Sequence, residues 1–161
     1  MTVAPDQLRT VMHLWATGVT LVTSHDQGKP HGMTVSSFTS ISLSPPLILV
    51  SLEKSSQTHR LISQSGVFAV SILHESQADL ADRFAGRIPD HADRFEDVPY
   101  TTAETGSPIP DSCLAYLDCR LVASHPAGTH TLFIGEVASA AVRQESRPLL
   151  YFRRGYRHLA E

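Results

Sequence analysis

The chain has 161 residues, of which 42% are hydrophobic and 18% charged, so residues 1–161 are enough for one globular domain with its own core. A net charge of −3 and a pI near 6.3 argue against a nucleic-acid-binding face, which needs clustered basic residues. No apolar run approaches the ~20 residues that cross a bilayer, and MTVAPDQLRT lacks the basic and apolar regions of a signal peptide. We therefore expect a cytoplasmic protein that binds neither nucleic acid nor membranes.

The first half of the chain is predicted to contain short helices and strands. Leu8, Val11, Met12 and Trp15 recur at helical spacing within residues 5–15, and we expect this apolar stripe to pack in the core. Further along, the sequence predicts strands at 19–25, 47–52 and 67–73, with a turn at 26–29 after the first of them. It also predicts a helix from 54 to 64 that stops at Gly66 and a helix from 76 that stops near Gly86.

The second half of the chain is predicted to be mostly strand. Residues 87–110 carry few periodic signals and are interpreted as a long loop, a feature that is often functional. Strands are expected at 112–125, 129–142 and 149–156, with a turn at 126–128. Short strands joined mostly by tight turns favour a mainly β protein with an antiparallel barrel and a few short helices.

The two cysteines, Cys113 and Cys119, fall in one predicted strand. Six residues of straight strand would hold them roughly 20 Å apart, which excludes a mutual disulfide. We expect both to be small core residues with reduced thiols.

Several motifs that carry well-known chemistry are absent from the sequence. No two of the nine glycines are separated by a single residue, so a G-x-G-x-x-G dinucleotide loop is excluded, and there is no Walker loop. No Gly-x-Ser-x-Gly elbow is present, so a serine hydrolase has little support. None of the nine histidines forms an H-x-x-x-H pair and neither cysteine lies in a C-x-x-C pair, so we expect no metal site.

Residues 33–46, MTVSSFTSISLSPP, carry seven hydroxyl groups between Thr34 and Ser44. The alternation of apolar residues shifts between Ser36 and Ser40, as at a bulge, which would free backbone N–H groups beside the hydroxyls. Such groups suit a polar planar ring or a phosphate. An exposed sheet face rich in Ser and Thr explains this stretch alone equally well.

A second hydroxyl cluster, Lys54-Ser-Ser-Gln-Thr58, opens a predicted helix. Helix N-termini bind anions, and Ser56 and Thr58 would add hydroxyl groups to a phosphate site. Taken alone, ordinary capping by Ser55 or Ser56 explains the cluster better. Because the two clusters flank one apolar strand, a ligand with a polar ring system and a phosphate would fit both.

The order of these segments resembles that of the short-chain NAD(P)H:flavin oxidoreductase family, the reductase partners of two-component flavin monooxygenases. The resemblance covers about residues 16–159 and rests on ATGVTLVTS (16–24), HGMTVSSFTSISLSPPLILVSL (31–52), KSSQT (54–58), FAVSIL (68–73), LADRFAG (80–86), GTHTLFIGEV (128–137) and PLLYFRRGYRHL (148–159).

The resemblance implies an antiparallel split β-barrel that binds FMN or FAD, usually as a homodimer. Hydride would pass from NADH or NADPH to the flavin, and a flavin-dependent monooxygenase would take the reduced flavin. The site residues that it implies are Thr34, Val35, Ser36 and Ser37 at the isoalloxazine and ribityl groups, Ser51 and Leu52 in the same site, Ser56 and Thr58 at the phosphate, Phe84, Ala85 and Gly86 closing over the flavin, His130 as the catalytic residue near the nicotinamide, and Tyr151 and Arg153 beside the pyridine nucleotide.

Two departures from the family pattern affect the nucleotide side. The aspartate of the family's Gly-Asp-His motif is Thr129 here, and in the ending Tyr151-Phe-Arg-Arg-Gly-Tyr156 the glycine lies one place later than in Tyr-x-Arg-Gly-x-Tyr. The choice between NADH and NADPH therefore stays open.

Two alternatives use the same type of barrel. The chain could be a flavin- or haem-binding module without NAD(P)H reductase activity. An oxidase of the pyridoxamine-phosphate type would call for clustered Arg and Lys near the flavin, and no dense basic cluster lies outside 153–157. For single residues, surface exposure of His130 and Arg153 and simple packing of Phe84 at a helix end are the ordinary explanations.

Overall fold

The computed structural model describes residues 2–87 and 93–160. The helices within them are α1 (Pro5–Met12), α2 (Gln57–Ser65) and α3 (Ala78–Phe84). The strands are β1 (Thr17–Gly18), β2 (Thr20–Asp26), β3 (Lys29–Val35), β4 (Phe38–Leu43), β5 (Pro46–Glu53), β6 (Val67–Ile72), β7 (Tyr100–Thr102), β8 (Pro108–Pro110), β9 (Ala115–Ala127), β10 (His130–Val142), β11 (Leu150–Phe152) and β12 (Gly155–Arg157).

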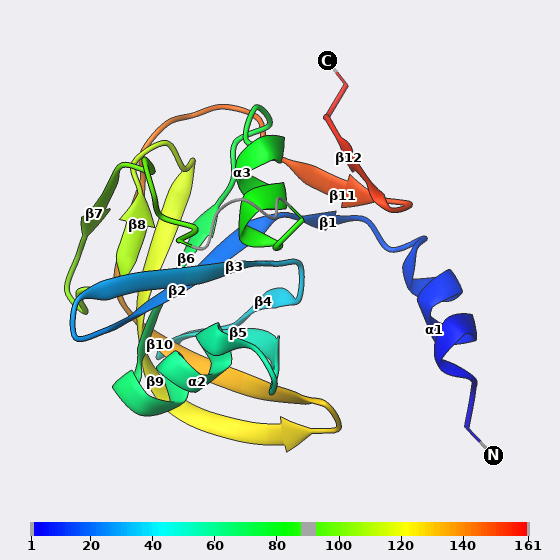
Figure 1. The fold of residues 1–161 in the computed structure, drawn as a ribbon, viewed down its shortest axis with the longest axis horizontal. Coiled ribbons are helices and arrows are strands. Elements are labelled where there is room, and N and C mark those ends of the chain that lie inside the picture. Colours follow the sequence, from blue (N-terminus) through cyan, green and yellow to red (C-terminus); the bar gives the residue numbers. More distant parts are fainter. Residues whose placement is uncertain (1, 88–92, 161) are drawn as a thin grey trace.

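Seven antiparallel strands form the main sheet in the order β3-β2-β6-β9-β10-β5-β4 (Figure 1). The two edge strands, β3 and β4, are consecutive in the sequence and are joined directly by Ser36 and Ser37. The sheet therefore curls until its edges meet at one connecting segment instead of closing by a hydrogen-bonded ladder. This mainly β, antiparallel split-barrel architecture confirms the predicted fold class.

The inside of the curled sheet holds the main core. Val22, Val50, Phe68 and Phe133 are at most 1% exposed, and Ile62 of α2 packs among them. Full burial of such side chains contributes about 1.5–3 kcal/mol each to folding. A second core cluster lies beneath α3, where Phe84 packs with the residues Val19, Leu21, Leu73, Ala81, Phe95 and Leu149.

Helix α2 begins three residues later than the predicted start at 54, after the N-cap Ser56, and ends before Gly66 as predicted. The Ser56 hydroxyl accepts a hydrogen bond from the His59 backbone N–H, which makes Ser56 the N-cap. Gly66 ends the helix with φ 71°, a left-handed conformation that glycine adopts without a Cβ clash.

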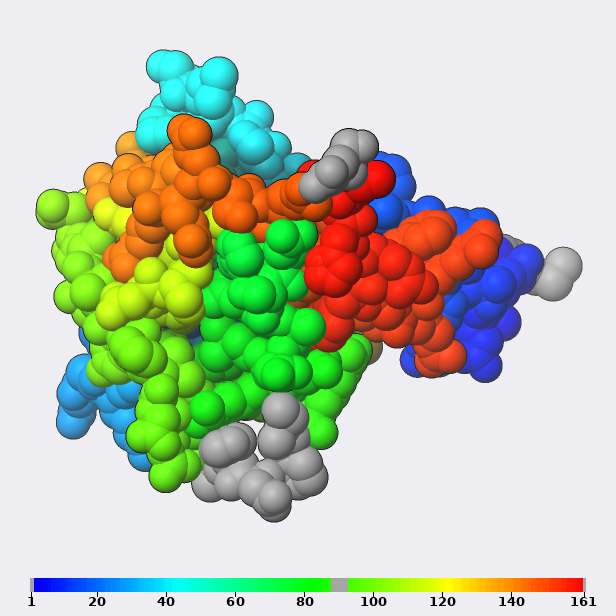
Figure 2. Space-filling view, turned by 90° about the horizontal axis from the view of Figure 1, so that it is seen from above, coloured from blue at the N-terminus to red at the C-terminus, as the bar shows by residue number. Residues whose placement is uncertain are grey.

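The N-terminal helix does not pack in the core, and this part of the prediction is wrong. Helix α1 forms, but Leu8, Val11, Met12 and Trp15 are 51–67% exposed. Figures 1 and 2 both show the N-terminal segment projecting from the body of the molecule. The stripe has helical periodicity, but none of residues 2–87 and 93–160 buries it.

The C-terminal segment is a hairpin and not the single strand that was expected at 149–156. Strands β11 and β12 pair with each other, and β11 also pairs with β1. Arg153 and Arg154 adopt positive φ values of 49° and 62° at the turn, although neither is glycine. The expected loop at 87–110 contains the short β7–β8 pair, and residues 88–92 of it lie outside the described residues.

Both cysteines are buried with free thiols, in agreement with the expectation. Cys113 precedes β9 instead of lying in the same strand as Cys119. Burial raises the pKa of both thiols, for Cys119 to about 12. Neither thiol is therefore a ready nucleophile at neutral pH.

Candidate functional site

The hydroxyl-rich segment lies where the chain passes from one edge of the sheet to the other. Strand β3 ends at Val35 and β4 begins at Phe38, so the shift of the apolar pattern marks a strand break. A bulge also occurs, but later, between Ser40 and Ser42. Ser37 is tied to β5: its carbonyl accepts from the Ser51 N–H at 3.0 Å, and its hydroxyl donates to the Ser51 carbonyl at 2.7 Å.

Across from this segment lies the N-terminus of α2. Thr58 is fully buried, and its hydroxyl is hydrogen-bonded to Nδ1 of His31 at 3.1 Å. The first turn of an α-helix has no internal partners for its N–H groups. The His59 N–H is capped by Ser56, which leaves the N–H groups of Gln57 and Thr58 for an external acceptor.

A cavity of about 250 Å³, the α2 cavity, connects these elements. It is lined by His31, Met33, Thr34, Ser56, Gln57, Thr58, Phe84, Ala85 and Arg94. The Arg94 guanidinium is held in place, because its Nη1 donates to the carbonyls of Gly32 and Phe84 at 2.9 Å each. Its pKa is lowered by burial.

A second cavity, the Tyr151 cavity, continues from the first, with which it shares Thr34 and Ala85. It measures about 140 Å³ and is lined by Val19, Thr34, Ser36, Ala85, Arg87, Tyr151 and Tyr156. Arg87 donates to the Tyr151 hydroxyl at 3.3 Å, and this bond is the main reason that the Arg87 pKa is raised. The Tyr156 hydroxyl donates to Asp82 at 2.7 Å, and burial is the main cause of its raised pKa.

The two cavities fit a flavin. One end offers unpaired backbone N–H groups at a helix N-terminus, which suit a phosphate. The other end offers the Ser36 hydroxyl, which makes no hydrogen bond with a described residue, and the ring of Tyr151. A ligand with a polar ring at one end and a phosphate at the other would satisfy both ends.

The structure brings together seven of the predicted site residues in these cavities. They are Thr34, Ser36, Ser56, Thr58, Phe84, Ala85 and Tyr151. Most of their side chains already have structural roles: Ser56 caps α2, the Thr58 hydroxyl is bonded to His31, and the Tyr151 hydroxyl accepts from Arg87. Phe84 is fully buried against Phe95, and the Thr34 hydroxyl donates to the Ala81 carbonyl at 2.5 Å.

The other predicted residues lie around the cavities without lining them. Val35 and Leu52 are in the main core, and Ser37 and Ser51 bond to each other as described above. Gly86 follows α3 with φ 73°.

His130 and Arg153 also lie outside the two cavity linings. His130 begins β10 opposite Glu53, and its Nδ1 is hydrogen-bonded to the Thr129 hydroxyl at 2.9 Å. Arg153 lies on the exposed turn between β11 and β12, and its backbone N–H donates to the His13 carbonyl.

Besides the apolar Val19 and Met33, five polar or charged residues of this site were not predicted from the sequence. They are His31, Gln57, Arg87, Arg94 and Tyr156. Arg87 and Arg94 lie in the long 87–110 segment, whose length indicated a functional loop without pointing to either arginine. The sequence carried no specific signal for His31, whose role depends on α2 packing over β3.

Two further observations limit the kinds of site present. No three His, Cys, Asp or Glu side chains gather as metal ligands within residues 2–87 and 93–160. In the same residues, every helix is too short to span a bilayer as an apolar segment.

Comparison with known proteins agrees with this site. The family model for the flavin reductase like domain matches residues 12–160. The reductase subunit HsaB of a flavin-dependent monooxygenase from Rhodococcus jostii is 40% identical over 152 residues, covering 94% of this chain and 76% of its relative.

Two solved structures share the fold along nearly the whole chain. The flavin reductase PheA2 in its native state superposes with a TM-score of 0.92 and 38% identity, covering 99% of this chain and 100% of the other. The NADH:FAD oxidoreductase SgcE6 from Streptomyces globisporus, in complex with NAD and FAD fragments, superposes with a TM-score of 0.89 and 35% identity. The match covers 99% of this chain and 97% of SgcE6. The chain therefore belongs to the flavin reductase like family.

Proposed function

We propose that this chain is an NAD(P)H-dependent flavin reductase that moves hydride from a reduced nicotinamide to FMN or FAD. The observation that carries the proposal is the pair of joined cavities between the Ser36 segment, the α2 N-terminus and Tyr151. Flavin itself supplies the hydride-accepting ring, so the reaction needs no side-chain nucleophile. The protein's part is to bind and align the two reactants, which agrees with the absence of a nucleophile motif.

Each region of the groove has a distinct task in this proposal. The Gln57 and Thr58 N–H groups bind the flavin phosphate. Ser56 holds this helix end in place, because its hydroxyl accepts from the His59 N–H and donates to the Glu53 carbonyl. Thr34, Val35 and Ser36 border the ring and ribityl chain. Ser37 supports them from the β3–β4 connection, and Ser51 and Leu52 support them from β5. Phe84, Ala85 and Gly86 close the groove from α3.

His130, Tyr151 and Arg153 form the nicotinamide side of the proposed site. The bond from Thr129 leaves Nε2 of His130 available to orient the nicotinamide. The same bond suits a positioning role better than a role as a base. NADH is the expected donor, since the similar SgcE6 is named as an NADH:FAD oxidoreductase.

We further propose that the chain acts as a homodimer and delivers reduced flavin to a monooxygenase. The exposed apolar stripe of α1 needs a cover, and a second copy of the chain would provide it. The monooxygenase partner is inferred from HsaB, which is named as the reductase subunit of such an enzyme. Two free buried thiols agree with a reducing compartment such as the cytoplasm.

Steady-state kinetics with FMN, FAD and riboflavin against NADH and NADPH test this function. We expect nucleotide oxidation that depends on added flavin. Tight binding of a yellow or haem chromophore without any nucleotide oxidation would instead identify a binding module and overturn the proposal.

A further inference from the structure

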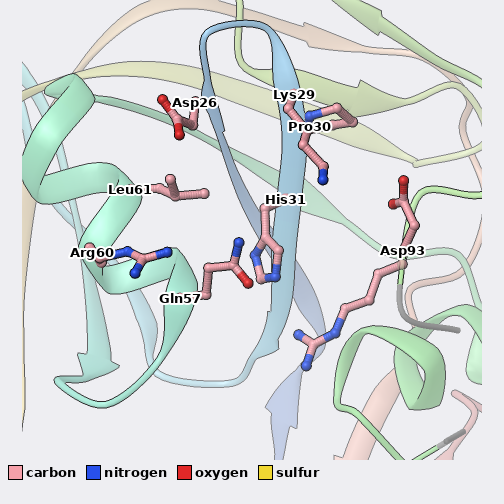
Figure 3. A pocket seen from close by; sticks show the side chains of 9 residues that line it. Asp26, Lys29, Pro30, His31, Gln57, Arg60, Leu61 and Asp93 are labelled. Carbon is pink, nitrogen blue, oxygen red and sulfur yellow. The ribbon is translucent and has the colours of Figure 1, made fainter.

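A third cavity, the hairpin cavity, extends the flavin groove beyond the N-terminus of α2 (Figure 3). It measures about 410 Å³, more than either of the other two, and shares His31, Gln57 and Arg94 with the α2 cavity. Its remaining lining residues are Asp26, Lys29, Pro30, Arg60, Leu61 and Asp93. The three cavities thus follow β3 from Ser36, just past its end, to Lys29, a path of seven residue steps or roughly 23 Å in extended chain.

Three cations line the hairpin cavity along its length, from Arg94 where it joins the α2 cavity to Lys29 at the β2–β3 hairpin. The charges of Arg94, Arg60 and Lys29 all lower the pKa of His31, and the Asp93 charge acts in the opposite direction. The side chains of Lys29 and Arg60 form no ion pair or hydrogen bond with a described residue. A phosphate placed next to the one at α2 would therefore find unpaired cationic partners.

The walls of the hairpin cavity provide groups of another kind. Pro30 and Leu61 are apolar, and Figure 3 shows the His31 ring between β3 and α2, beside the Gln57 amide. Burial, which is the largest cause, and the Arg94 charge lower the pKa of His31 to about 4, so the ring is neutral at physiological pH. A neutral imidazole with apolar neighbours suits stacking with a nucleobase.

Two carboxylates line the same cavity, Asp26 at the β2–β3 hairpin and Asp93 directly before Arg94 in the chain. Asp26 is paired with Lys29 at the tip of the hairpin, and its side chain makes no hydrogen bond with a described residue. Asp93 lies across the cavity, with one carboxylate oxygen bound to the Phe95 N–H at 2.9 Å. Carboxylates accept hydrogen bonds from ribose hydroxyls or an exocyclic amine.

We propose that the hairpin cavity binds the adenosine-phosphate half of FAD, so that this chain selects FAD over FMN. The inference rests on the proposed function, because it places the flavin phosphate at α2. FMN would end at that phosphate and leave the hairpin cavity unused. FAD would continue past Gln57 and Arg94, with its second phosphate near Arg60 and its adenosine between His31, Pro30 and the two carboxylates.

The test is equilibrium binding of FAD and FMN, followed by flavin fluorescence or calorimetry. The wild-type chain should bind FAD at least about tenfold more tightly than FMN. The double variant Lys29→Ala, Arg60→Ala should lose most of this preference, while its FMN Kd changes less than about twofold. Both side chains are exposed, so the fold should tolerate their removal. Arg120→Ala, an exposed arginine on β9 away from the groove, is the matched control.

Two results would overturn the inference. The first is an equal Kd for FAD and FMN in the wild-type chain, or an equal loss of both in the double variant. The second is a double variant whose FAD Kd is unchanged but whose KM for NADH, with FMN as the acceptor, is raised. The hairpin cavity would then bind the adenosine half of the pyridine nucleotide. Failure of the proposed function looks different, because neither flavin would then be reduced.

Discussion

Thr129 lies next to His130, where the family resemblance implies an aspartate, and the two side chains are hydrogen-bonded at 2.9 Å. The bond occupies Nδ1, so it fixes the plane of the ring and leaves Nε2 for the nicotinamide. A threonine hydroxyl can orient the ring as an aspartate would, but it adds no negative charge.

At this position, Thr129→Val should raise the KM for NADH about fivefold with a smaller change in kcat, because the ring loses one orienting bond. Thr129→Ser should restore the wild-type KM, since it keeps the hydroxyl. Steady-state kinetics at saturating flavin measure both values. An unchanged KM in the valine variant would show that Thr129 does not position His130.

His31 makes the stability of the chain pH-dependent. Its pKa is about 4 in the folded chain and near 6.5 when unfolded, so between these values the unfolded state binds more protons. The contribution of His31 to the free energy of unfolding is fully present above about pH 6.5 and is lost as the pH falls toward 4. Allowing for its partial exposure, we expect a loss of about 2 kcal/mol.

Urea unfolding at about pH 7 and about pH 4.5 measures this effect. The variant His31→Gln should show a correspondingly smaller loss of unfolding free energy on acidification. Equal losses in the variant and the wild type would place the pH dependence on other groups.

At the scale of single elements, β10 depends on a residue without a side chain. A Cβ on Gly135 would lie 2.5 Å from Cζ of Phe68 and 2.9 Å from Cβ of Cys119, both of which are fully buried. Gly135→Ala should therefore destabilise the fold by about 1–3 kcal/mol. Gly18→Ala is the control, because a Cβ there meets nothing within 4 Å. Thermal unfolding compares the two, and equal Tm values would contradict this packing.

Local chemistry explains which elements could be predicted from the sequence. Helix α2 was predictable because Ser56 and Gly66 cap it by bonds and dihedrals that lie within the helix itself. The C-terminal hairpin was not, because its turn uses Arg153 and Arg154 at positive φ, where a sequence pattern would require glycine or asparagine.

The same distinction applies to the site. The hydroxyl clusters were visible in the sequence, but their assembly with His31 and Arg94 depends on contacts between residues far apart in the chain. The Arg94 bonds to Gly32 and Phe84 join three separate segments and leave no periodic signal.

At the scale of the whole molecule, α1 projects from the body of the chain with its apolar stripe exposed (Figure 2), and the proposed homodimer would cover that stripe. The double variant Leu8→Glu, Val11→Glu should shift the protein from dimer to monomer, because it places two charges in the apolar stripe. Gln7→Glu with Thr10→Glu adds the same charge outside the stripe and should leave the dimer intact. Sedimentation velocity distinguishes these states. A dimer that survives the first pair of changes would place the interface elsewhere.

The central claim is that the groove along β3 holds a flavin for reduction by a nicotinamide. Anaerobic stopped-flow mixing of flavin-loaded protein with NADH tests it most directly. We predict rapid loss of the visible absorbance of oxidised flavin in the wild type and in Ser40→Val, which changes an exposed serine outside the groove. Ser36→Val should weaken flavin binding about tenfold, because it removes the free hydroxyl and narrows the Tyr151 cavity. Flavin that stays oxidised with both NADH and NADPH, or a Ser36→Val variant with wild-type flavin affinity, would contradict the account.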